Sequence, residues 1–201
     1  EQSVADAGMT GVGSAFFNTR GGNHMAKLRD IYNYEIPRFS PLRDAARRAT
    51  AAYQNAARGL DTLKEWVLVE FGLVHTADAI HRLAHEQPKR FDVIGDILHQ
   101  RHLMQEYPET PEYRKRPEDM DGVFREVIRL LEDIEGALRD CVAASEEVGL
   151  YPLAREFENL QMENSKSYET MLYAWQMYDK TDGSATSYDN WVEKLFDGEE
   201  A

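Results

Sequence analysis

The sequence predicts an all-α protein, a bundle of long helices in which one long connection crosses from one end to the other. Three observations predict this class. Apolar residues recur at helical spacing, and no stretch alternates apolar and polar residues as a half-buried strand does. Several of the predicted helices have about 25 to 30 residues and therefore span roughly 38–45 Å. A charged, proline-rich segment at 108–117 is long enough to join opposite ends of such a bundle.

The N-terminal part is predicted to form an arm, 1–39, before the bundle begins. Residues 1–25 are rich in small residues and lack helical periodicity, and Asn23-His24-Met25 resembles a junction between a leader and a native start. Ser40-Pro41 predicts the first helix start, because a capping hydroxyl precedes a proline in the first turn. An Ala-rich helix should follow and be interrupted at Arg58-Gly59.

Two helices are predicted next. Thr62 and Glu65 form a capping-box pattern, which opens a helix that can run to Glu86. Pro88 should stop it, because proline lacks the backbone N–H that a helix interior needs. A shorter helix is expected over about 91–107, closed by prolines.

The second half of the chain is predicted to form a helical hairpin that completes a bundle over residues 40–180. About 30 residues of helical period follow Glu118, Gly149 marks a turn, and Asp182-Gly183 ends the next helix. Residues 181–201 are a tail whose short amphipathic helix should dock on the bundle or on a neighbouring subunit. The predicted inward positions are Val123, Val127, Leu131, Ile134, Leu138, Cys141, Leu153, Phe157, Leu160, Tyr168, Met171, Trp175 and Tyr178.

Composition and charge narrow the function classes. The chain has 201 residues, of which 42% are hydrophobic, and no apolar run reaches the roughly 18 residues that span a bilayer, so we expect no membrane contact. The lone Cys141 excludes an intrachain disulfide, fits a cytoplasmic location and shares an apolar face, which favours an inert core thiol. The net charge of −13 argues against nucleic-acid binding by the body, since phosphate contacts need clustered Lys and Arg.

Five of the six histidines lie between positions 75 and 102, interleaved with carboxylates at helical spacing. Residues three or four apart share a helix face, so Asp78 aligns with His81, and His85 lies one turn further on. Imidazole nitrogens and carboxylate oxygens presented together bind iron, manganese or zinc. We predict a metal site in this region, although a single histidine on a helix is more often a surface residue than a ligand.

A second stripe, which we rank first as a ligand set, contains Asp96, His99 and Glu106. His102 follows His99 by three residues, and both His75 and His102 can orient a ligand instead of binding the metal. Two Asp-x-x-His pairs on consecutive predicted helices are harder to dismiss than one histidine.

Glutamates elsewhere can complete a di-metal site inside the bundle. Glu70 shares a stripe with Val67, Val74 and Asp78. Solvated helix faces explain most of the remaining glutamates more simply. The candidates on the last two bundle helices are Glu132, Glu135, Glu156 and Glu163.

The segment from Asp119 to Asp179 resembles the last two helices of ferritin-like proteins, particularly of the mini-ferritin (Dps) branch. The shared features are a long amphipathic helix, a short Gly-containing turn and a helix with an aromatic stretch, here 168–175. The family's histidine motif is matched only roughly, by His85 and by Leu98-His99. Asp-x-x-His stands here where larger di-iron bundles have Glu-x-x-His.

The resemblance implies a ferritin-like four-helix bundle with an extra N-terminal segment and a short C-terminal helix, assembled as a homo-oligomer into a closed cage. It also implies that the protein oxidises Fe(II) with peroxide or dioxygen and stores the ferric product. Iron (Fe2+/Fe3+) is the expected metal, and manganese and zinc suit the same ligands. Family members often bind DNA through basic arms, which the arginines at positions 38, 43, 47 and 48 permit without requiring.

Two alternatives from other classes stay open. One is a helical-bundle oxidoreductase with a di-metal centre and no storage. The other is a non-catalytic helical interaction protein in which the His/Asp stripes are polar helix contacts.

Overall fold

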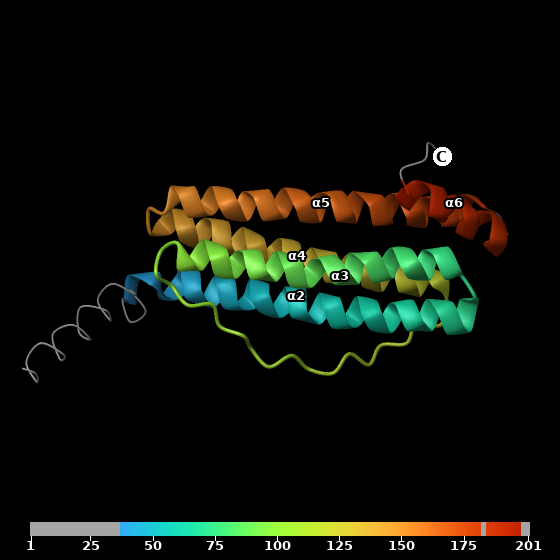
Figure 1. The fold of residues 1–201 in the computed structure, drawn as a ribbon, viewed down its shortest axis with the longest axis horizontal. Coiled ribbons are helices and arrows are strands. Elements are labelled where there is room, and N and C mark those ends of the chain that lie inside the picture. The colour runs from blue at the N-terminus through green and yellow to red at the C-terminus, as the bar shows by residue number, and fades with distance from the viewer. Residues whose placement is uncertain (1–36, 182–183, 198–201) are drawn as a thin grey trace, which may run out of the picture.

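The computed structural model describes residues 37–181 and 184–197, and all regular secondary structure within these ranges is helical (Figure 1). The predicted all-α class is therefore confirmed. The predicted arm lies outside the described residues except for 37–39, and so does the helix stop predicted at Asp182-Gly183. The elements are η1 (Pro37–Phe39), α2 (Ser40–Trp66), η2 (Val67–Phe71), α3 (Val74–His99), α4 (Met120–Glu147), α5 (Tyr151–Lys180) and α6 (Ala185–Asp197).

Four long helices, α2 to α5, lie side by side in a bundle (Figure 1). α2 forms an antiparallel pair with α3, α4 forms one with α5, and α2 also packs along α4. The crossover segment, residues 100–119, runs back along α2, so that α3 and α4 point in the same direction. The crossover predicted at 108–117 is confirmed and is longer than predicted.

The α4–α5 hairpin follows the predicted pattern. All six inward positions predicted for α4 are buried, and so are four of the seven predicted for α5, while Tyr168, Trp175 and Tyr178 pack against the core with part of their surface exposed. The Asp119 side chain caps α4 by accepting a 2.7 Å hydrogen bond from the Gly122 N–H. Gly149 has the left-handed φ of 75° that closes the turn.

Helix α2 is not interrupted at Arg58-Gly59, so that prediction is wrong. A Cβ atom on Gly59 would lie 2.8 Å from Leu130 Cδ1 and 3.0 Å from the Tyr113 ring. The glycine therefore lets α4 and the crossover segment pack closely against an unbroken helix. Thr62 does not cap a helix either, because its hydroxyl donates to the Arg58 carbonyl one turn back, at 2.9 Å.

The first hairpin turns instead at Gly72, which has a left-handed φ of 67° and follows the wider helical turn η2. Pro88 lies inside α3, so the stop predicted there is wrong. Ile80 and Ile94, on either side of it, are both buried. A proline inside a helix costs about 3 kcal/mol, and burial of about 1.5–3 kcal/mol per large aliphatic side chain on both sides offsets it.

The short helix predicted over 91–107 is also wrong. Residues 91–99 belong to α3, and the chain turns away from the helix axis at His102. In the described part of the chain, His102 is the one non-glycine residue with a positive φ, 58°. The Leu103 N–H bonds to the Leu98 carbonyl and the His102 N–H to the His99 carbonyl, both at 3.0 Å. This is the hydrogen-bond pattern of a Schellman cap, in which His102 takes the position that glycine usually occupies.

The tail docks on the bundle, as one of the two predicted options. Asp189 of α6 is buried and accepts hydrogen bonds from the His75 and Thr76 N–H groups and from the Thr76 hydroxyl, at 2.8–3.0 Å. It supplies the side-chain cap that the N-terminus of α3 lacks locally. Tyr188 and Val192 are buried beside it.

None of the helices in the described part of the chain is both long and apolar enough to cross a lipid bilayer.

Candidate metal centre

Helices α2 and α3 bring three potential ligands together on the bundle surface. α2 contributes Asp61, and α3 contributes His81 and His85, one turn apart on the same face. One ligand atom from each lies within 4.8 Å of the other two. Among the described residues, this is the one group of three or more His, Cys, Asp or Glu side chains with that proximity.

The three side chains already face one another. His81 Nδ1 lies 3.1 Å from Asp61 Oδ1, which is a hydrogen bond when that nitrogen carries the proton. The rings of His81 and His85 meet edge to face, with their centroids 4.3 Å apart. A cation bound to His81 Nδ1 would replace this hydrogen bond, because a metal binds the imidazole nitrogen that carries no proton.

The hairpin geometry explains why these residues meet. The chain turns at Gly72, so residues at similar distances before and after it lie opposite each other in the antiparallel helices. Asp61 lies 11 positions before Gly72, and the two histidines lie 9 and 13 positions after it. Asp61 is not among the predicted ligands, because the capping-box pattern predicts that a new helix begins at Thr62. Placing the turn at Gly72 would have paired Asp61 with both histidines.

The donor set points to particular metals. Two imidazoles and one carboxylate with open positions are typical of non-haem Fe(II) sites, and zinc accepts the same ligands. Asp61 and His85 are exposed, whereas His81 is half-buried. A metal held by these three residues would be open to solvent, so that water, an oxidant or a side chain of another molecule could reach it.

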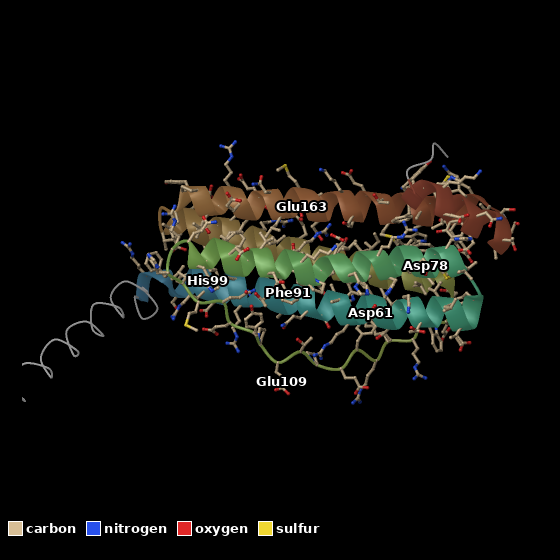
Figure 2. All side chains as sticks on the ribbon, in the orientation of Figure 1. Asp61, Asp78, Phe91, His99, Glu109 and Glu163 are labelled. Carbon is tan, nitrogen blue, oxygen red and sulfur yellow. The ribbon has the colours of Figure 1, made fainter. Side chains whose placement is uncertain are left out.

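Asp78, the carboxylate predicted to accompany His81, is exposed on α3 and stands outside this group. Figure 2 shows Asp61 and Asp78 toward one end of the bundle and His99 toward the other. Of the first predicted stripe, the structure thus brings together the two histidines and replaces their local carboxylate with one from α2.

The second predicted stripe is not one helix face, which corrects its expected geometry. Asp96 and His99 are exposed on the last turn of α3, but Glu106 lies beyond the helix in the crossover segment. Glu106 is 3.6 Å from the Arg47 guanidinium. His102 ends the helix through its backbone, as described above. The helix cap after His99 separates the residues that a longer helix would have aligned.

Other candidates have structural partners. His75 faces Glu193 of the tail, with Nδ1 3.6 Å from Oε1. Glu135 is half-buried and accepts a 2.9 Å hydrogen bond from Gln161, and Glu163 lies 3.7 Å from Arg90. The candidates that are simply exposed are Glu70, Glu132 and Glu156.

The described core contains one buried carboxylate, Asp189, and it caps α3. The other buried polar side chains are hydroxyls and amides, among them Thr50, Gln87 and Asn164. A di-metal centre inside the bundle needs several carboxylates that project inward. The described interior does not provide them, so the candidate ligands lie on the surface.

Comparison with known proteins does not assign the chain to a family. No protein-family model matches it, and a search of curated proteins finds no match either. The resemblance to mini-ferritins therefore stays a prediction.

Proposed function

We propose that this protein binds Fe(II) at Asp61, His81 and His85, oxidises it with peroxide or dioxygen, and stores the ferric product in an oligomeric cage. One observation carries the proposal: three ligand atoms from two antiparallel helices lie within 4.8 Å of one another, with two imidazoles and one carboxylate among them. This donor set suits non-haem Fe(II), and zinc accepts the same ligands.

The helix arrangement supports the ferritin-like part of the proposal. A four-helix bundle with one long crossover is typical of ferritin-like folds, and here the crossover joins α3 to α4. The resemblance in the α4–α5 region points to the same class. The formal net charge of −13 favours an acidic particle that attracts iron cations.

The chemistry asked of the side chains is simple. The two histidines and Asp61 hold Fe(II) and leave positions open for the oxidant. Each Fe(II) gives up one electron. Hydrogen peroxide accepts two electrons and two protons, and dioxygen accepts four of each, to become two water molecules. The Asp61 carboxylate favours the product, because a hard anionic oxygen stabilises Fe(III) more than Fe(II).

The test is aerobic addition of Fe(II) to metal-stripped protein, with the rate of Fe(III) formation followed by absorbance. The double variant His81→Ala/His85→Ala should oxidise iron at least tenfold more slowly than the wild type. The matched control is Asp96→Ala/His99→Ala on the same helix, which should stay within twofold. Loss of oxidation in the control alone would overturn the site assignment.

Size-exclusion chromatography of the same samples, with iron quantified across the peaks, tests storage. Tens of irons per chain in a large particle support a cage. One or two irons per chain would instead favour an oxidoreductase without storage. No bound iron would favour the non-catalytic interaction protein.

A further inference from the structure

The crossover segment and α2 line a cleft of about 970 Å³ whose wall is positively charged. Its cations are Arg58 on α2 and three consecutive residues of the crossover segment, Arg114, Lys115 and Arg116. Its carboxylates are Asp61 and Glu112. Positive charge thus prevails locally in a protein whose net charge is −13.

Two of these arginines keep their charge available. Arg58 donates a 2.8 Å hydrogen bond to the carbonyl of Thr110, which is neutral. The Arg116 guanidinium lies over the ring of Trp66, 5.6 Å from its centroid, and this partner is neutral too. Neither contact cancels the charge that an anion would meet in the cleft.

The other two cations have carboxylate partners of different strength. Arg114 bonds to Glu112 at 2.8 Å, but both side chains are more than two-thirds exposed. Such a pair is worth roughly 0–1 kcal/mol, so a better anion can take the place of Glu112. Lys115 is held by Glu126 of α4, which itself accepts hydrogen bonds from Tyr113 and Arg129.

The cleft is preformed because the crossover segment is tied to its neighbours at several points. Arg58 holds the Thr110 carbonyl, and the Trp66 Nε1–H donates to the Pro117 carbonyl at 2.8 Å. Between these points Tyr113 lies against Gly59 and donates to Glu126 at 3.0 Å. A preformed wall lowers the entropy that a ligand must offset on binding.

We propose that this cleft binds a small oligophosphate, whether inorganic or the phosphate chain of a nucleotide. Guanidinium groups recognise phosphate oxygens through paired hydrogen bonds. Several cations along one wall match a ligand that carries several charges. The volume lies at the upper end of the roughly 300–1,000 Å³ typical of small-molecule sites. The inference does not require the proposed iron chemistry, since anion binding can be measured on metal-free protein.

The test is calorimetric titration of the full, metal-free chain with inorganic tripolyphosphate at low and at physiological salt. We expect saturable binding of one anion per chain. The variant Arg114→Gln/Arg116→Gln should bind at least tenfold more weakly. The control Arg139→Gln/Arg155→Gln removes the same charge from exposed positions on α4 and α5 outside the cleft, and should stay within twofold.

A variant expected to gain affinity separates binding from misfolding. Glu112→Gln removes the carboxylate that competes for Arg114, so tripolyphosphate should bind at least threefold more tightly. A parallel titration with ATP distinguishes the ligand's source: tighter binding than tripolyphosphate supports a nucleotide, and equal binding supports an inorganic chain.

Three results would overturn the inference. The first is an absence of saturable binding of both anions. The second is an equal loss in the cleft variant and its control, which would mean that only net charge matters. The third is tighter binding of single-stranded DNA than of either small anion, which would make the cleft part of a nucleic-acid surface.

Discussion

Helix α3 carries two Asp-x-x-His pairs of identical spacing, and the surroundings of their histidines differ. His81, from the first pair, faces Asp61 across the hairpin and has His85 one turn further on. His99, from the second, lies exposed on the last turn, where the helix ends before a further ligand can align. The spacing of residues along one helix can align two ligands on the same face. The third ligand depends on which helix packs alongside, and this decides which pair can hold a metal.

The largest expected effect tests this difference directly. His81→Ala should lower the affinity of the metal-stripped protein for Co(II) at least 100-fold, because removing a ligand exceeds the roughly 10–100-fold cost of losing a group that only orients one. His99→Ala should change it less than twofold. Titration followed by the cobalt absorption bands measures both. Equal losses in the two variants would erase the distinction between the pairs.

A smaller effect compares the cross-helix carboxylate with the local one. Asp61→Asn should weaken Co(II) binding about tenfold, since a carboxylate ligand becomes a neutral amide, while Asp78→Asn should have little effect. Asp61 also lines the cationic cleft, so the same change should tighten tripolyphosphate binding by removing a repulsive charge. If the affinities for Co(II) and for tripolyphosphate changed in the same direction, Asp61 would not act on both sites in the way described.

Next in size is the effect of filling the close contact between Gly59 of α2 and Leu130 of α4. Gly59→Ala should lower the free energy of unfolding by about 1–3 kcal/mol, because the new methyl group would overlap Leu130. Gly136→Ala on α4 meets no atom within 4 Å and should raise it by up to about 1 kcal/mol through helix propensity. Denaturant unfolding measures both. A stabilised Gly59→Ala protein would contradict the packing argument.

The smallest expected effect lies at the end of the second pair. His102→Gly should raise the free energy of unfolding by about 0.5–1 kcal/mol, because glycine takes the left-handed conformation without the roughly 1–2 kcal/mol cost of a side chain. Co(II) affinity should not change. A loss of affinity would return His102 to the ligand set.

The two hairpins also differ in how well they could be predicted. The α4–α5 hairpin has a local cap at Asp119, a glycine at its turn and an uninterrupted apolar period, so its boundaries could be predicted closely. In the α2–α3 hairpin, Gly59, Thr62 and Pro88 are local stop or start signals that tertiary packing overrides. The true turn at Gly72 had no proline beside it.

The candidate site could be predicted only in part for the same reason. The helical spacing of His81 and His85 is a local property, and it led to both residues. Asp61 belongs to the partner helix, and its position opposite them follows from the turn at Gly72. The predicted alignment of Glu106 with His99 requires a continuous helix, but the cap at His102 ends the helix before Glu106.

The sequence by itself determined the all-α class, the inward face of the second hairpin and the long crossover, because periodicity, capping and proline content act over a few residues. Only the tertiary structure decided that α2 and α3 continue through a glycine and a proline, that Asp189 caps α3, and that Asp61 joins the histidines. These features depend on contacts between segments far apart in the chain. The energies of these contacts offset the local penalties of about 1–3 kcal/mol for a glycine or a proline inside a helix, which the sequence pattern alone predicts to be helix ends.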